Sequence, residues 1–288
     1  VSAFDDTSEL TVIRESDFSV IDTLDLSGTA NTDGIVWDGS FVYLGKSIND
    51  AGGELYKVDV SNPSNVSLTS ELEVGDSVND VKIDRSGTYL IAATRYDTKN
   101  FYVADIATFT EAHSGDLYGG SQAESVTAFG AHGYAGTTTS GSDVEVFRVS
   151  PGGWSDAQLV GNADLQGNHD ESSITVFGNY VYQATENNGT NPDFFIYDIS
   201  TPTSPTYLGS IDSNSDVNDV LVSGNYVYLA TKDNAREVIV IDVTTKTSPQ
   251  IVGSYDAMGS RDGVSLALSG TTLYLGRDDG SDPEFYVL

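Results

Sequence analysis

The sequence predicts an all-β protein, a six-bladed β-propeller whose blades are four-stranded and antiparallel. Three observations lead to this prediction. Short runs of β-branched and aromatic residues alternate with clusters of Gly, Asn, Asp, Ser and Pro, which is the pattern of strands and turns. A unit of four such runs recurs, and consecutive copies lie 43 to 48 residues apart. Four strands at that period are typical of propeller blades, which bury their faces by stacking on neighbouring copies.

The clearest copy of the unit lies between residues 216 and 256. Turn residues such as Ser223-Gly224-Asn225 separate its runs, and glycine favours such turns because it adopts positive φ without steric cost. We therefore expect four strands, at residues 217–222, 226–231, 238–243 and 251–255.

The other copies align on the glycine of the first hairpin turn, which is Gly39, Gly87, Gly130, Gly178, Gly224 or Gly270 in chain order. Their first hairpins read GIVWDGSFVYLGK (34–46), VNDVKIDRSGTYLIAATR (78–95), ESVTAFGAHGYAGTTT (124–139), SSITVFGNYVYQAT (172–185), VNDVLVSGNYVYLAT (217–231) and DGVSLALSGTTLYLGR (262–277). Each hairpin is followed by a third strand, and in most copies by a recognisable fourth.

The sixth copy has only three strands, and residues 18–26 (FSVIDTLDL) have the character of a fourth. We expect this N-terminal strand to complete the last blade and close the ring, which removes exposed sheet edges. Leu10 to Arg14 are left over, and they leave a seven-bladed propeller as the alternative. The expected organisation is a partly ordered N-terminal extension, residues 1–17, and a single propeller domain, residues 18–288.

Composition limits the partners and the compartment. Thirteen basic residues against 43 acidic ones give a formal net charge of −30, so we expect neither nucleic acid nor membrane as a partner of this segment. The absence of cysteine excludes disulfides, thiolate metal sites and cysteine nucleophiles. Abundant Ser, Thr, Asn, Asp and Gly with few lysines favours an extracellular or cell-surface location. Because the chain starts at Val1, we also expect that an N-terminal segment has been removed.

Two third-to-fourth-strand segments carry a recognisable pattern, residues 194–212 (FFIYDISTPTSPTYLGSID) and 238–256 (VIVIDVTTKTSPQIVGSYD). In each, an apolar strand ends in Asp, a Ser/Thr-Pro turn follows, and a second strand closes on Gly-Ser. The pattern resembles LVIVD repeats, with a weaker copy at 55–73. Residues 101–112 depart by lacking both prolines, and residues 144–161 by lacking the Asp. The resemblance implies a β-propeller like those of bacterial and archaeal cell-surface proteins, with no catalytic set and no defined ligand.

One first-strand position is equivalent in all six copies and should lie beside the central axis. It is occupied by Gly34, Asp80, Ser125, Ser173, Asp219 and Ser265. Asp80 and Asp219 stand in identical Val-Asn-Asp-Val contexts, in copies that oppose each other in a six-fold ring. Two carboxylates flanked by hydroxyls and carbonyls suit Ca²⁺, so Asp80 and Asp219 are the candidate metal ligands. Alternatively, each pairs with a basic residue at the end of a second strand: Lys46, Arg95, Lys232 or Arg277.

Many acidic residues fall in two kinds of loop that emerge on the same face of a propeller. Those entering the first strand contain Asp33, Asp76, Asp80, Glu124, Asp170, Glu171, Asp216, Asp219 and Asp262; those after the second strand contain Asp50, Asp97, Asp233, Asp278, Asp279 and Asp282. We expect much of the net charge to gather on that face, although Asp also serves turns by accepting hydrogen bonds from nearby backbone.

No catalytic set is recognisable. His113, His132 and His169 are spread over two blades, which argues against a three-histidine metal centre. There is no Gly-x-Ser-x-Gly elbow and no phosphate-binding loop. Trp37 adjoins a strand and is expected in the core, whereas Trp154, in a Pro-Gly-Gly turn, is expected at the surface.

We therefore expect a non-catalytic interaction or assembly module of the cell surface, with other surface proteins or glycans as partners and no cofactor. Two alternatives stay open. One is a Ca²⁺-dependent enzyme or small-ligand binder at the acidic mouth of the propeller, and the other is a subunit of a surface filament.

Overall fold

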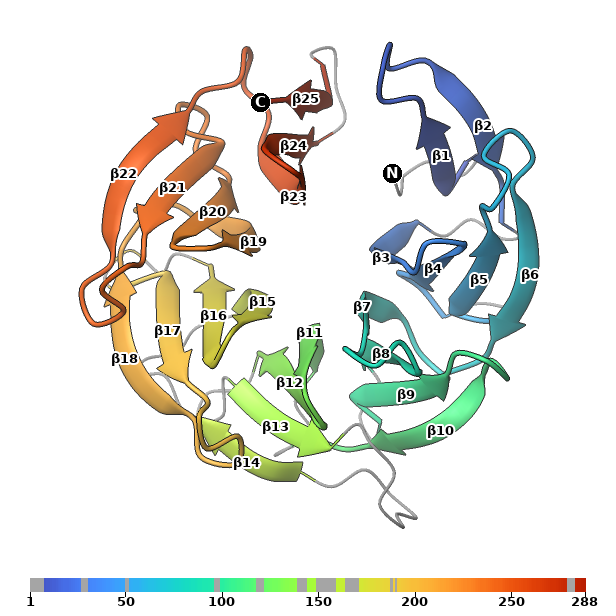
Figure 1. The fold of residues 1–288 in the computed structure, drawn as a ribbon, viewed down its shortest axis with the longest axis horizontal. Coiled ribbons are helices and arrows are strands. Elements are labelled where there is room, and N and C mark those ends of the chain that lie inside the picture. The colour runs from blue at the N-terminus through green and yellow to red at the C-terminus, as the bar shows by residue number, and fades with distance from the viewer. Residues whose placement is uncertain are drawn as a thin grey trace. The chain divides into compact units, whose positions relative to one another are not determined.

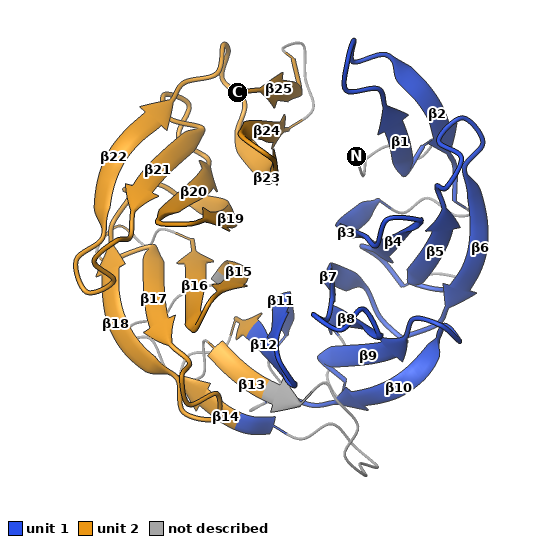
Figure 2. Ribbon diagram, viewed as in Figure 1, with its two compact units in different colours: residues 1–135, 147–160 blue, residues 136–146, 161–288 orange. Residues whose placement is uncertain are grey.

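The computed structural model describes residues 8–26, 31–49, 52–95, 99–117, 122–138, 144–148, 159–163, 171–186, 189, 191–278 and 283–288. Within these ranges the chain forms strands and turns and no helix, so none of the described residues belongs to a membrane-spanning helix. The strands gather into two compact units, residues 1–135 with 147–160 and residues 136–146 with 161–288 (Figure 2).

The first unit contains a two-stranded sheet, β1-β2, and two four-stranded sheets whose strands follow in chain order (Figure 1). Every neighbouring pair is antiparallel, as expected for sheets joined by short turns. The strands are β1 (Leu10–Ile13), β2 (Val20–Leu24), β3 (Thr32–Trp37), β4 (Phe41–Lys46), β5 (Leu55–Asp59), β6 (Ser67–Leu72), β7 (Val78–Ile83), β8 (Tyr89–Thr94), β9 (Phe101–Asp105) and β10 (Thr110–Gly115).

A third four-stranded sheet contributes residues to both units. Its strands are β11 (Ala123–Phe129), β12 (His132–Thr137), β13 (Val144–Arg148) and β14 (Leu159–Ala163).

The second unit contains two further four-stranded sheets and a sheet of three strands. The strands are β15 (Glu171–Phe177), β16 (Tyr180–Thr185), β17 (Phe194–Asp198), β18 (Thr206–Ile211), β19 (Val217–Ser223), β20 (Tyr226–Thr231), β21 (Val238–Asp242), β22 (Gln250–Tyr255), β23 (Gly263–Ser269), β24 (Thr272–Arg277) and β25 (Phe285–Val287). The four strands predicted between residues 216 and 256 are confirmed as β19 to β22.

The glycine in the first turn of each sheet has the conformation that the alignment required. All six residues have positive φ, between 60° and 107°, a region that L side chains rarely adopt. These glycines therefore mark the same turn in every copy, and the alignment that predicted the blades is confirmed.

The N-terminal strand differs from expectation in its partner. Residues 20–24 form β2 as a fourth strand should, but β2 pairs with β1, the stretch that the sequence count left over. The predicted pairing with the last blade is thus corrected: among the described strands, β23-β24-β25 form a sheet of three. The physical reason is that β1 repeats the third-strand pattern of β5 and β21, so β2 finds a third strand directly before it.

The hydrophobic cores lie between successive sheets, as expected for sheets that bury both faces. Leu10 and Leu26 are buried with Leu44, Tyr56 and Val58, so β1 and β2 pack on the sheet that follows them. Residues 8–17 of the expected extension are therefore part of the first unit, and residues 1–7 lie outside the described residues.

Candidate functional site

Both copies of Val-Asn-Asp-Val lie at a β-bulge near the start of a first strand. The register shifts between Val78 and Asp80 in β7, and between Val217 and Asp219 in β19. A bulge leaves one residue unpaired in the ladder, and here that residue is Asn79 or Asn218. The bulge thus frees the asparagine to reach the neighbouring sheet.

The asparagine and aspartate of each copy hold the first strand of the next sheet. Asn79 Nδ2 donates to the carbonyl of Ala123 at 2.8 Å, and Asp80 Oδ2 accepts from Val126 N at 3.1 Å. In the second unit, Asn218 Nδ2 donates to the carbonyl of Gly263 at 2.7 Å, and Asp219 Oδ2 accepts from Leu266 N at 2.8 Å. We call this arrangement the Asn-Asp clamp. Each clamp thus gives a hydrogen-bond partner to one backbone carbonyl and one backbone N–H of the next sheet.

The second oxygen of each aspartate also accepts hydrogen bonds. Asp80 Oδ1 accepts from Val81 N at 2.8 Å and from Lys82 Nζ at 2.6 Å. Asp219 Oδ1 accepts from Val220 N at 2.8 Å and from Ser173 Oγ at 3.0 Å. Each candidate metal ligand is therefore engaged by at least three protein donors.

In the sheet of β3 to β6, Gly34 occupies the position equivalent to Asp80 and Asp219, and its surroundings explain why a small residue is needed there. A Cβ atom on Gly34 would lie 2.7 Å from Val81 N and 2.9 Å from the Cα of Asp80, both backbone atoms of the neighbouring strand. Backbone atoms cannot give way as a flexible side chain can, so only glycine fits against β7 at this point.

The prediction that Asp80 pairs with a basic residue at the end of a second strand is wrong. Its basic partner is Lys82, two residues along the same strand, with the Lys82 side chain 39% exposed. Of the basic residues proposed as partners, Arg95 lies 3.6 Å from Glu124, Lys232 pairs with Glu186 and Asp216, and Arg277 pairs with Glu237. Arg95, Lys232 and Arg277 thus have acidic partners other than the two clamp aspartates.

In the first unit, a basic residue lies among the acidic residues of the loops that enter the first strands. Arg95 pairs with Glu124, which also accepts from Asn79 Nδ2 at 3.1 Å. Desolvation by the surrounding protein raises the pKa of Asp33 to about 6, although its side chain keeps contact with solvent; Arg95 opposes the rise and Glu124 adds to it. A guanidinium already supplies positive charge among these carboxylates.

In the second unit, too, a basic residue lies among acidic ones. Lys232 Nζ lies 3.4 Å from Glu186 Oε1 and 3.3 Å from Asp216 Oδ2. Partial burial opposes protonation of Lys232, yet Glu186 and Asp216 raise its pKa overall. Burial and the nearby charge of Asp278 raise the pKa of Asp262. Here too, a protein cation lies among the acids.

Across the described ranges, no three His, Asp or Glu side chains are grouped so as to hold a metal ion. Asp80 and Asp219 belong to different units, and a Ca²⁺ site that uses both stays a prediction. Several residues named above lie outside the described residues: Asp50, Asp97, Trp154, His169, Asp170, Asp279 and Asp282; the side chain of Glu171 does too.

Trp37 is not in the core, contrary to expectation, since its side chain is 64% exposed. Residues of a strand alternate between two faces, and along β3 the buried positions are Thr32 and Gly34. Trp37 shares the opposite face with Asp33 and Ile35, both exposed.

A set of buried polar residues was not predicted from the sequence, and one of them lies directly before the third strand of most sheets. Each accepts a hydrogen bond from a backbone N–H after the fourth strand, 17 to 20 residues further on. Buried carboxyl groups need such partners. The signal was in the sequence, as an Asp, Glu or Asn before each apolar third strand. The residues are Glu9, Glu54, Asn100, Asp193 and Glu237, each at most 1% exposed.

Two of these acids make stability depend on pH. Burial raises the pKa of Glu54 to about 7, with N–H donors from Val74 and Gly75 opposing the rise. Burial likewise raises the pKa of Asp193 to about 6. A carboxyl group whose pKa is higher in the folded than in the unfolded state contributes stability below the unfolded pKa. That contribution is lost as pH rises through the folded pKa.

We expect the E54Q variant to gain stability relative to the wild type as pH rises from 4 to 8. The gain should be on the order of 2 kcal/mol in the free energy of unfolding, measured by urea unfolding at several pH values. D198N is the control with the opposite sign. Hydrogen bonds from Ser200 lower the pKa of Asp198. The wild type should therefore gain stability relative to D198N as the pH rises from 2 to 5. A pH-independent difference for E54Q would contradict the assignment.

The Asp that ends each LVIVD-like third strand has a local role. Asp59 and Asp198 accept hydrogen bonds from the backbone N–H two residues further on, at 2.9 and 2.7 Å, and Asp242 does the same at 2.8 Å. This is an Asx turn, which starts the connection to the fourth strand.

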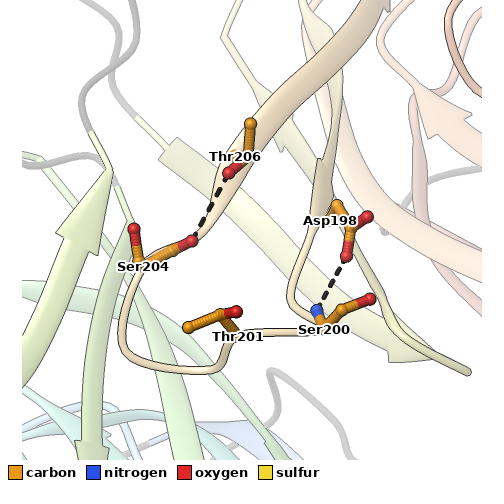
Figure 3. A pocket seen from close by; sticks show the side chains of 5 residues that line it. All are labelled: Asp198, Ser200, Thr201, Ser204 and Thr206. Carbon is orange, nitrogen blue, oxygen red and sulfur yellow. Dashed lines mark hydrogen bonds between the residues drawn. The ribbon is translucent and has the colours of Figure 1, made fainter.

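In the sheet of β15 to β18, this turn borders a small pocket between β17 and β18 (Figure 3). Asp198 accepts from Ser200 N, and Thr206 Oγ1 donates to the carbonyl of Ser204 at 3.5 Å. The pocket is lined by the turn's own residues, Asp198, Ser200, Thr201, Ser204 and Thr206, and its carboxylate serves the turn.

Comparison with solved structures defines the class of protein. The crystal structure of the computationally designed Ika8 protein is similar at a TM-score of 0.67 and 16% identity, covering 96% of this chain and 76% of that one. The Myceliophteria thermophila Cps50 (Swd1) β-propeller domain is similar at a TM-score of 0.65 and 11% identity, covering 90% and 85%. At these identities the likeness concerns the fold alone. With the sheets above, it identifies an all-β, six-bladed propeller with four-stranded antiparallel blades.

Within that class, the chain carries LVIVD repeats. The family model matches residues 31–73, 170–213 and 215–257. These are the weaker copy and the two strong copies that the sequence pattern singled out, so the resemblance is confirmed. The two departing segments are not among the matched ones. Comparison with curated proteins gives no match.

Proposed function

We propose that this LVIVD-repeat propeller is a non-catalytic interaction or assembly module of the cell surface, with surface proteins or glycans as partners. The observation that carries the proposal is that Asp80 and Asp219, the candidate metal ligands, take part in the contacts between neighbouring sheets. Each accepts at least three hydrogen bonds from protein donors. These hydrogen bonds tie each carboxylate to the next sheet, which supports a role in the assembly of the blades.

Exposed apolar side chains support an interaction role. Trp37, Val252 and Met258 are 64%, 56% and 81% exposed. Large exposed apolar and aromatic residues contribute strongly to binding when a partner covers them. The acidic composition and the LVIVD repeats support an extracellular setting.

The competing function is a Ca²⁺-dependent enzyme or small-ligand binder at the acidic loops. The observation in its favour is the raised pKa of Asp33 and Asp262, since perturbed acids are common in active sites. The third candidate is a subunit of a surface filament, which negative-stain images of the purified protein would reveal.

The two functions predict different responses to metal. A bound ion would raise the melting temperature by mass action. Because the proposed module needs no metal, we expect the same melting temperature in EDTA and in millimolar Ca²⁺. We also expect no turnover in a broad hydrolase and lyase screen. A Ca²⁺-dependent rise of several degrees, or turnover that a D33N variant abolishes, would reject the non-catalytic proposal.

A further inference from the structure

A turn of the first unit contains a complete acceptor sequence for an N-linked glycan, Asn65-Val66-Ser67. Such sequences have the form Asn-x-Ser/Thr, where x is not proline, and they are modified in exported proteins. A second one, at residues 188–190 (NGT), includes residues outside the described ranges. Because Asn, Ser and Thr are abundant in this chain, such a triplet indicates a site only where the fold exposes it and leaves room for a sugar chain.

The two residues that a glycan transferase recognises are both exposed. Asn65 lies in the turn between β5 and β6, and its backbone N–H donates to the carbonyl of Asn62 at 3.0 Å. Asn65 and Ser67 are exposed, and neither side chain makes a hydrogen bond with another of the described residues. The amide nitrogen of Asn65 and the hydroxyl of Ser67 are therefore available for chemistry.

Val66, between these two residues, anchors the turn. It is 9% exposed and packs in the same core cluster as Val58, and its backbone N–H donates to Asp22 Oδ2 at 2.9 Å. Successive residues of an extended chain point to opposite sides, so the burial of Val66 directs the residues on either side of it outward. The anchor thus presents Asn65 and Ser67 at the surface of the folded protein.

The surroundings of the turn leave room for a glycan. β6 begins at Ser67 and is an edge strand, which pairs with β5 alone among the described strands. The first three residues of β6 are exposed, and so are residues 61–64 on the other side of Asn65. A bulky, hydrated group on Asn65 therefore displaces no packed side chain.

The same turn contains a comparison for this site. Asn62-Pro63-Ser64 has the Asn and the Ser of an acceptor sequence, but proline occupies the middle position, which the pattern excludes. Asn62 is exposed, and its Oδ1 accepts from Ser64 N at 3.2 Å, as in an Asx turn. Two exposed asparagines three residues apart thus differ in whether they meet the requirement for transfer.

We propose that Asn65 is a glycosylation site, at which an oligosaccharide is linked to the side-chain nitrogen. The donor is an oligosaccharide carried on a lipid phosphate. A bond forms between Asn65 Nδ2 and C1 of the first sugar, and the bond from C1 to the phosphate oxygen breaks. The lipid phosphate leaves, and the amide nitrogen gives up one proton to a base of the transferase. The proposal rests on the proposed function, since this modification belongs to exported chains.

Peptide mapping by mass spectrometry, on protein isolated from the cells that naturally produce it, tests the site. Asn62 and Asn65 lie on one tryptic peptide, residues 58–82, so fragment spectra must assign the sugar to one of them. We expect an oligosaccharide on Asn65 and an unmodified Asn62. An unmodified Asn65 would overturn the proposal.

Variants secreted from a eukaryotic host that glycosylates its exports test the sequence requirement. S67A should lose the glycan at Asn65 although the asparagine remains, and S67T should keep it. N62Q is the matched control in the same turn and should also keep it. Both substituted positions are exposed, so the variants should melt like the wild type. A glycan that persists at Asn65 in S67A, or disappears in N62Q, would contradict the assignment.

The location of the protein separates this proposal from the proposed function. Protein found at the cell surface with Asn65 unmodified would reject the glycosylation site and leave the interaction module standing. Protein confined to the cell interior would reject the surface module itself, and the site with it.

Discussion

Replacing Glu237 by alanine is expected to lower the free energy of unfolding by about 3–5 kcal/mol. Glu237 and Arg277 form an ion pair at 3.4 Å with both side chains fully buried. Glu237 also accepts from Ala257 N at 2.8 Å. Its removal leaves a guanidinium buried without its carboxylate and a backbone N–H without an acceptor. Both losses carry a desolvation cost, although Arg277 keeps its hydrogen bonds to the carbonyls of Arg261 and Met258.

Denaturant unfolding of E237A measures this loss, and E186A is the matched control in the same unit. Glu186 pairs with Lys232 at 3.4 Å, but the two side chains are 52% and 38% exposed. An exposed pair contributes about 0–1 kcal/mol, so E186A should unfold close to the wild type. Equal losses for the two variants would show that burial does not set the strength of these pairs.

The second large effect is expected at the Asn-Asp clamp. D80N and D219N should each lose about 1–3 kcal/mol of stability, to the same extent in EDTA and in Ca²⁺. Asparagine keeps one acceptor oxygen and places an NH₂ group where a carboxylate oxygen was. Because Asp80 and Asp219 accept hydrogen bonds at both oxygens, one N–H or O–H donor of the protein then meets another donor.

Thermal or urea unfolding of each variant with and without Ca²⁺ checks the clamp, and D59N is the control. Among the described residues, Asp59 accepts hydrogen bonds from Ser61 of its own turn, so D59N should change stability by less than about 1 kcal/mol. If D80N and D219N lost stability in Ca²⁺ but matched the wild type in EDTA, the metal site would replace the clamp.

Local features of the chain were predictable because residues close in sequence determine them. The turn glycines, the alternation of strands and the Asx turns after Asp198 and Asp242 depend on φ preferences and short-range hydrogen bonds. The three LVIVD repeats were visible for the same reason. Trp37 was placed wrongly because its face of the strand depends on register, and a shift of one residue exchanges the two faces.

The candidate site was only half predictable. Asp80 and Asp219 stood out by their identical contexts, and they do share one structural role. Their partners were not visible, because the acceptor and donor lie 46 or 47 residues apart and meet only when neighbouring sheets stack. The pairing of β2 with β1 was missed for a related reason, since a fourth strand fits any third strand of the same pattern.

By itself, the sequence determined the class of protein: repeated short strands, antiparallel hairpins and LVIVD segments allow few folds other than a propeller. Tertiary structure alone decided which charges neutralise one another, as in Glu237 with Arg277 across 40 residues. The reason is that strand propensity and turn chemistry act over a few residues, whereas burial and pairing of polar groups depend on what the next sheet brings against them.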